Sequence, residues 1–163
     1  MTEIRLDSLA RGFIGFADNF ERLIARGCNQ VGKKVRRDAT EKIGHYQPSV
    51  GPFPAWQNLS AYTLKIKQKA GAVSDDPLIG HYPENKKNKV WNAHLRTTIE
   101  WEMQGWAAVH IGTADPLGEY HEYGVPEHNL PPRPFLRPAA FENEEFFQNE
   151  MAVAYQKAID SIL

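Results

Sequence analysis

The chain has 163 residues, 42% of them hydrophobic, four tryptophans and a formal net charge of −1. This length and apolar content predict one globular domain with its own core, spanning residues 1–163, and exclude a disordered chain. No run of eighteen apolar residues occurs, so the sequence predicts no membrane-spanning helix and no membrane partner. A single cysteine, Cys28, excludes an internal disulfide and favours a reducing cytosol.

Charge is divided along the chain. Residues 22–96 contain 14 Lys/Arg and 5 Asp/Glu, a net +9, whereas residues 97–163 contain 3 and 11, a net −8. An asymmetry of this kind is typical of a polyanion-binding surface or of two complementary faces. Two solvated faces within one fold explain it equally well, and the composition leaves these interpretations open.

The first predicted element is a long amphipathic helix. Residues 18–43 contain no proline, and apolar side chains recur there every three or four positions. This spacing predicts a helix with one buried stripe that extends back to Ser8 and ends near Gly44. Cys28 falls in the stripe and is interpreted as a packing residue rather than a nucleophile.

A weaker pattern follows the helix. Residues 46–56 are rich in proline and glycine, which predicts an extended loop. Ser60 is suited to cap a short helix ending at Gly71, although the Lys65-Ile66-Lys67 alternation also fits a strand. Residues 81–90 are polar and basic, which predicts a mobile loop.

The second half begins with a predicted β-hairpin. Apolar and polar residues alternate over 99–104 and again over 107–111, on either side of a turn at Gly105. Asp115 is suited to begin a short helix, and Gly124 to end it in the left-handed conformation. An amphipathic helix is expected over residues 140–163. The predicted fold is α+β: a long N-terminal helix, a small antiparallel sheet with a hairpin, and a C-terminal helix packed on the sheet.

The sequence predicts no catalytic centre, cofactor or metal site. His121, Glu122 and His128 superficially suggest metal ligands, but a helical zinc site needs two histidines one turn apart. Position 125 is Val, and His128 lies beyond the glycine that is expected to end the helix. The remaining histidines show no ligand spacing, and no phosphate-binding or hydrolase motif is present.

Three basic clusters could contact DNA phosphates without sequence specificity, because no base-reading motif accompanies them. The acidic half of a neighbouring copy is a competing partner for the same charges. The clusters are Lys33, Lys34, Arg36 and Arg37; Lys65, Lys67 and Lys69; and Lys86, Lys87 and Lys89.

The segment from 121 to 139, HEYGVPEHNLPPRPFLRPA, is unusually rich in proline. Its prolines predict a stiff, polyproline-like arm that excludes both helix and central strand. Phe135 and Leu136 would anchor this arm, and Arg133 and Arg137 would bind carboxylates. A docking interface and a connector across the chain's own sheet are both compatible with the composition.

This segment resembles a motif of tailed-bacteriophage minor tail proteins of the tail-completion, or virion-morphogenesis, family. The matching positions are Tyr120, Glu122, Tyr123, Gly124, Pro132, Arg133, Pro134, Phe135, Leu136, Pro138 and Ala139. Two upstream elements are also similar to the family, at Trp56, Leu59, Ser60, Thr63 and Lys67, and at Leu95, Arg96, Thr98 and Ile99.

The resemblance implies a non-catalytic virion protein at the neck or the head-proximal end of the tail, assembled in the host cytoplasm. Such proteins form sixfold or twelvefold rings that complete the tail and join it to the head around the DNA channel, beside other neck and tail proteins. The implied interface residues are Tyr120, Glu122, Tyr123, Pro132, Arg133, Pro134, Phe135, Leu136, Arg137 and Trp56. A non-specific DNA-binding accessory protein, acting through the basic clusters, is the alternative.

Overall fold

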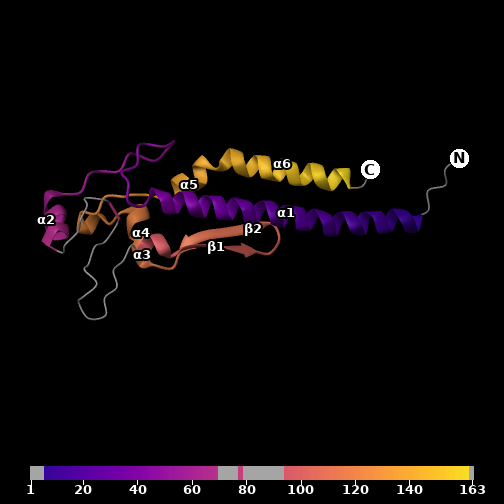
Figure 1. The fold of residues 1–163 in the computed structure, drawn as a ribbon, viewed down its shortest axis with the longest axis horizontal. Coiled ribbons are helices and arrows are strands. Elements are labelled where there is room, and N and C mark those ends of the chain that lie inside the picture. Colours follow the sequence, from indigo (N-terminus) through magenta and orange to yellow (C-terminus); the bar gives the residue numbers. More distant parts are fainter. Residues whose placement is uncertain (1–5, 70–76, 79–93, 162–163) are drawn as a thin grey trace. The chain divides into compact units, whose positions relative to one another are not determined.

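The computed structural model describes residues 6–69, 77–78 and 94–161. The loop predicted over 81–90, with Lys86, Lys87 and Lys89, lies outside the described residues. In chain order the elements are α1 (Leu6–Lys42), α2 (Ala61–Lys69), α3 (His94–Thr97), β1 (Ile99–Gln104), β2 (Ala108–Thr113), α4 (Pro116–Tyr123), the 3₁₀ turn η1 (Pro126–His128), α5 (Leu136–Glu142) and α6 (Glu144–Asp160) (Figure 1). The predicted α+β class is confirmed. No helix in the described part of the chain is long and apolar enough to cross a membrane.

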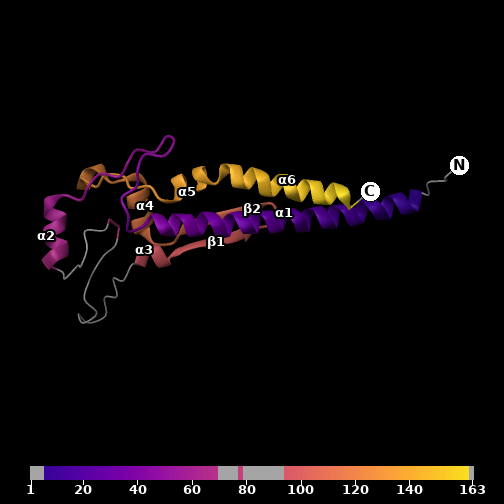
Figure 2. The same ribbon diagram turned by 45° about the horizontal axis from the view of Figure 1, so that its top comes forward.

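Contacts divide the chain into two compact units, and α1 and the hairpin each contribute to both. The first unit contains α1 up to Lys34, the hairpin between Trp101 and His110, and α6. Its core combines Ile24, Cys28 and Ala154, with Met103 and Met151 packed against them. α6 and the hairpin therefore both pack on α1 in this unit, α6 at Gly27 and the hairpin at Gly32, and α6 runs alongside α1 in both views (Figures 1 and 2).

The α1 stripe follows the predicted spacing, and Cys28 is buried in it as a packing residue. The hairpin crosses α1 closely at Gly32, where an added Cβ would lie 2.7 Å from Val109 and 3.1 Å from the Trp101 ring. Along β1 the predicted alternation holds, because Ile99 is buried and Trp101 is half-buried while the intervening glutamates are exposed.

The second unit contains the end of α1, residues 46–60, α2, α3, the base of the hairpin, α4 and α5. Ile43, Ile99 and Phe135 are fully buried in it. Residues 46–56 are a loop, as predicted, and the hydroxyl of Ser60 accepts a hydrogen bond from the Thr63 amide at 3.1 Å. This bond caps α2, so the helical prediction is confirmed over residues 61–69 and the strand alternative is wrong.

Three sequence predictions need correction here. The proline segment does not exclude helix, because α5 begins at Leu136 and accommodates Pro138 in its first turn, where a missing N–H costs no hydrogen bond. The predicted C-terminal helix is interrupted at Asn143, which separates α5 from α6. Gly124 ends α4 with φ 76° and ψ 169°, a conformation essentially restricted to glycine but distinct from the predicted left-handed helical one.

Candidate interaction site built on Glu122

The site begins with α4, whose sequence fixes both of its ends. The carboxylate of Asp115 accepts a hydrogen bond from the Leu117 amide at 2.9 Å, and Pro116 occupies the first helical turn. At the other end the Gly124 amide donates to the Tyr120 carbonyl at 2.8 Å. These ends place Glu122 in the last turn, with its side chain turned inward and buried.

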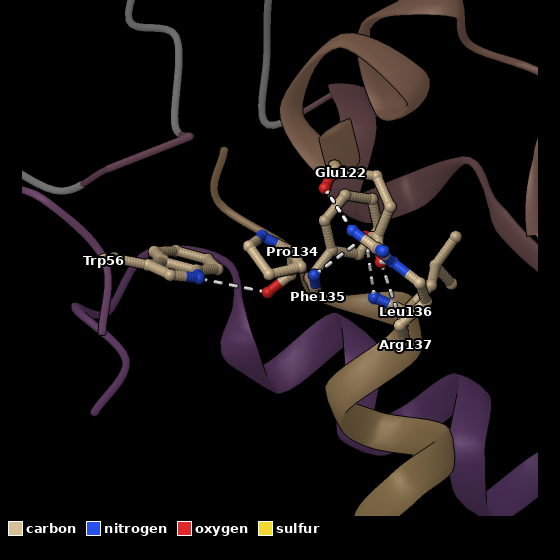
Figure 3. Close-up of polar contacts among 6 residues, drawn as sticks. All are labelled: Trp56, Glu122, Pro134, Phe135, Leu136 and Arg137. Atoms are coloured by element: carbon tan, nitrogen blue, oxygen red, sulfur yellow. Dashed lines mark hydrogen bonds and ion pairs between the residues drawn. The ribbon is translucent and has the colours of Figure 1, made fainter. Parts of the chain in front are cut away.

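The Glu122 carboxylate caps the start of α5, although it lies 13 to 15 residues earlier in the chain than the amides it binds. Its Oε2 atom accepts hydrogen bonds from the backbone amides of Phe135 at 2.9 Å and Leu136 at 3.1 Å (Figure 3). Its Oε1 atom accepts one from the Arg137 amide at 3.0 Å. A helix start leaves four amides without partners inside the helix, and the fourth position here is Pro138, which has no amide hydrogen. Every amide at the start of α5 therefore has a partner or needs none.

The side chain of Arg137 binds Glu122 from the solvent side. Its Nε donates to Glu122 Oε1 at 3.0 Å, and its Nη2 donates to the Glu122 carbonyl at 2.7 Å. The guanidinium lies 4.5 Å from the centre of the Tyr123 ring and 5.5 Å from that of Phe53. Arginine between two aromatic rings is a favourable cation–π arrangement.

The rings around Arg137 form a surface cluster, which we call the aromatic–arginine patch: Phe53, Tyr120, Tyr123, Arg137 and Phe141. Phe141 packs edge to face on Phe53 at 6.1 Å between ring centres. Tyr120 lies one turn before Tyr123 on α4. Tyr120, Tyr123 and Phe141 are 49%, 63% and 45% exposed, so the patch has three exposed rings, of which that of Tyr123 contacts the guanidinium.

The proline-rich segment before α5 is hydrogen-bonded to the rest of the second unit through Arg133 and Pro134. The indole Nε1 of Trp56 donates to the Pro134 carbonyl at 3.0 Å, and both residues are buried (Figure 3). Arg133 is buried as well, and its Nη2 donates to the Gln57 carbonyl at 3.1 Å. Its backbone amide donates to the His121 carbonyl at 2.6 Å. The segment therefore lies against α4 and residues 56–57 rather than forming a free arm.

Two buried nitrogens beside these contacts, His121 Nδ1 and Arg133 Nε, have no hydrogen-bond partner within the described residues. Burial lowers the pKa of His121 to about 4; the nearby Arg133 charge adds to this effect and Asp115 opposes it. Burial also lowers the pKa of Arg133, against an opposing contribution from Tyr46. At neutral pH the imidazole of His121 is therefore uncharged.

The interface residues that the family resemblance implies fall into a buried group and an exposed group. Trp56, Glu122, Arg133, Pro134 and Phe135 are buried in the second unit and bind other parts of it. Leu136 is half-buried, while Tyr120, Tyr123, Pro132 and Arg137 are exposed. Only the exposed group can meet a partner directly, and the buried group holds it in place.

Sequence reasoning missed Phe53 and Phe141, which lie outside the proline motif. Their aromatic character was the only available signal. The structure places their rings against each other and Phe53 against Arg137.

The basic residues of α1 contact groups of the chain itself. Lys33 lies 5.8 Å from the Trp101 ring centre and Lys34 lies 5.7 Å from that of Phe146. The Nε of Arg36 donates to the Ile99 carbonyl at 2.9 Å. Arg37 pairs with neighbouring acids on its own helix, Asp38 at 3.3 Å and Glu41 at 4.0 Å.

On α2, Lys65 and Lys69 are exposed and Lys67 is half-buried. At about 100° per residue, Lys65 and Lys69 lie on one side of the helix and Lys67 on another. The three lysines therefore do not form one continuous surface.

Within the described ranges, no group of three or more His, Cys, Asp or Glu side chains is placed to hold a metal ion. Comparison with known proteins finds no matching family model, no matching curated protein and no matching solved structure.

Proposed function

We propose that the chain is a structural virion protein that forms a ring at the phage neck or the head-proximal end of the tail. There it completes the tail and joins it to the head around the DNA channel. The resemblance of residues 120–139 to the family motif supports the proposal, and within that motif Glu122 accepts hydrogen bonds from the amides of two other matching residues, Phe135 and Leu136. The ring would contain six or twelve copies and contact other neck and tail proteins.

The observation that carries the proposal is the aromatic–arginine patch. Tyrosine and arginine are enriched among the residues that dominate binding energy at protein interfaces. Arg137 is fixed by Glu122 and by its two neighbouring rings, so it loses little conformational freedom when a partner binds. A rigid, exposed patch of this composition is suited to a permanent contact with another protein.

Self-association of the purified chain tests this role. We expect sedimentation velocity to show a discrete multimer, and the double variant Tyr120→Ala/Tyr123→Ala to weaken its assembly at least about tenfold. Val153→Ala is the matched control, because Val153 is an exposed apolar residue of α6 outside the patch. A double variant that assembles as the wild type does would remove the patch from the proposal.

The alternative is an accessory protein that binds DNA without sequence specificity. The observation in its favour is α2, which contains three lysines and no acidic residue. Binding through phosphate contacts would weaken steeply as salt is added, with a slope set by the number of contacts. A protein that stays monomeric and shows this salt dependence would fit the alternative rather than the ring.

A further inference from the structure

Helix α2 has nine residues and none of them is buried. A helix of this length is marginal in water by itself, and most helical stability in proteins comes from packing of one face. On α2, the half-buried residues that face the rest of its unit are Thr63, Leu64 and Lys67. The residues on the opposite side are exposed.

That opposite side has a regular composition, and we call it the α2 face: Tyr62, Lys65, Ile66 and Lys69. These residues follow the spacing i, i+3, i+4, i+7, so they lie together along one side of the helix. Tyr62 is 74% exposed and Ile66 is 45% exposed, and both lysines are exposed. On this face Tyr62 is followed one turn later by Lys65, and Ile66 is followed one turn later by Lys69.

A surface of opposite charge lies on α6, and we call it the α6 face: Glu144, Glu145, Gln148 and Ala152. All four residues are exposed. Glu145, Gln148 and Ala152 lie on one side of the helix, away from the buried Ala154, and Glu144 lies at the edge of this side that is nearer Ala158. Over its full length α6 has four acidic residues and one lysine, a net −3, against a net +3 on α2.

We infer that the α2 face of one copy docks on the α6 face of the next copy. Tyr62 and Lys69 lie seven positions apart, as do Glu145 and Ala152, which is about 10 Å of helix in each case. An antiparallel pairing brings Lys69, at the C-terminal end of α2, to Glu145 at the N-terminal end of α6. In that register Tyr62 and Ile66 meet Ala152 and Gln148. Lys69 meets Glu145 at the start of α6, and Lys65 lies about one turn away from that glutamate.

This pairing uses two different surfaces, one from each copy. A contact of this kind is head-to-tail, and repeated with the right rotation it closes into a ring. The inference rests on the proposed ring and names the surfaces that would join its subunits. It is separate from the aromatic–arginine patch, whose role is tested by its own variants.

Charge reversal tests the pairing. We expect Lys65→Glu/Lys69→Glu and Glu144→Lys/Glu145→Lys each to weaken self-association at least about tenfold in sedimentation velocity. The variant with all four substitutions should regain assembly, because its charges are again complementary. Gln68→Glu on α2 and Lys157→Glu on α6 are controls that change charge outside the two faces, and we expect them to assemble normally.

Cysteine cross-linking provides an independent readout that does not depend on charge. Copies with Tyr62→Cys are mixed with copies with Ala152→Cys in an oxidised glutathione buffer. We expect a disulfide-linked pair containing one copy of each variant. Cys28 is buried and should stay unreacted. The absence of such mixed pairs from an assembled sample would overturn the pairing.

The outcomes separate the inference from the proposed function. A multimer unaffected by either charge reversal overturns the pairing and leaves the ring in place. A wild type that is monomeric at every concentration overturns both. If Lys65→Glu/Lys69→Glu abolishes binding to a DNA duplex but not assembly, the α2 face contacts phosphates and the inference is wrong.

Discussion

Glu122 and Arg137 are joined by three hydrogen bonds, which involve the side chain and the backbone of both residues. The Glu122 carboxylate accepts from the amide and the Nε of Arg137, each at 3.0 Å, while the Glu122 carbonyl accepts from Nη2 at 2.7 Å. The glutamate is buried and the arginine is 44% exposed. One residue thus belongs to the interior and the other to the surface patch, so the stability of the fold and the geometry of the proposed interface depend on the same pair.

Replacing Glu122 should destabilise the second unit. Glu122→Ala leaves the amides of Phe135, Leu136 and Arg137 without acceptors, and we expect a loss of at least about 3 kcal/mol in the free energy of unfolding. Glu122→Gln keeps one accepting oxygen and should cost less. Urea unfolding followed by circular dichroism measures both. Glu119→Gln, on the exposed side of α4, should stay within about 0.5 kcal/mol of the wild type. Equal effects at 119 and 122 would contradict the capping role.

Replacing Trp56 tests how the proline segment is attached. Trp56→Phe keeps an aromatic ring but removes the donor to the Pro134 carbonyl, which then stays buried without its partner. We expect a cost of about 1–2 kcal/mol, read from the urea midpoint at unchanged slope. Trp106→Phe is the control, since Trp106 is 43% exposed, and it should cost under about 0.5 kcal/mol. If both variants were equally stable, the indole hydrogen bond would contribute nothing.

His121 should make stability depend on pH. Its pKa falls from 6.5 to about 4 in the folded protein, so the unfolded chain binds more protons between these values. Stability therefore decreases as the pH falls from about 6.5 toward 4, by up to about 3 kcal/mol. His121→Gln should flatten this part of the curve, and His128→Gln, at an exposed position, should not. The same slope in the His121 variant and the wild type would assign the effect to other groups.

Alanine substitutions at Gly124 and Gly105 distinguish the cost of a positive φ from the cost of a steric overlap. Both have positive φ, but a Cβ at Gly124 would lie 2.8 Å from the Leu130 carbonyl oxygen and from the Pro132 nitrogen, whereas one at Gly105 has nothing within 4 Å. Gly105→Ala should cost about 1 kcal/mol, and Gly124→Ala at least about 2 kcal/mol. Thermal unfolding of the two variants compares them directly. A Gly124 variant no less stable than the Gly105 variant would show that the close approach is relieved without cost.

Local sequence signals were sufficient for most of the elements. The three-to-four spacing predicted α1, the alternation around Gly105 predicted the hairpin, and Asp115 predicted the start of α4. Each of these signals lies within a few residues of the structure it specifies. Each also relies on a periodicity or a cap with a direct physical cause.

The site itself could be predicted only in part, because its contacts join distant segments. Glu122 caps a helix thirteen to fifteen residues away, and Trp56 binds a carbonyl 78 residues away. No local spacing encodes such pairs. The proline content was misleading at Leu136, because a proline in a first turn is compatible with a helix whose amides are bound from outside.

The stoichiometry of the assembled protein tests the ring most directly. We would measure it by native mass spectrometry on the purified wild-type chain over a range of concentrations. The proposed ring predicts one closed species of six or twelve copies, without a ladder of intermediate sizes. A monomer at all concentrations, or an open series of sizes that grows with concentration, would contradict it.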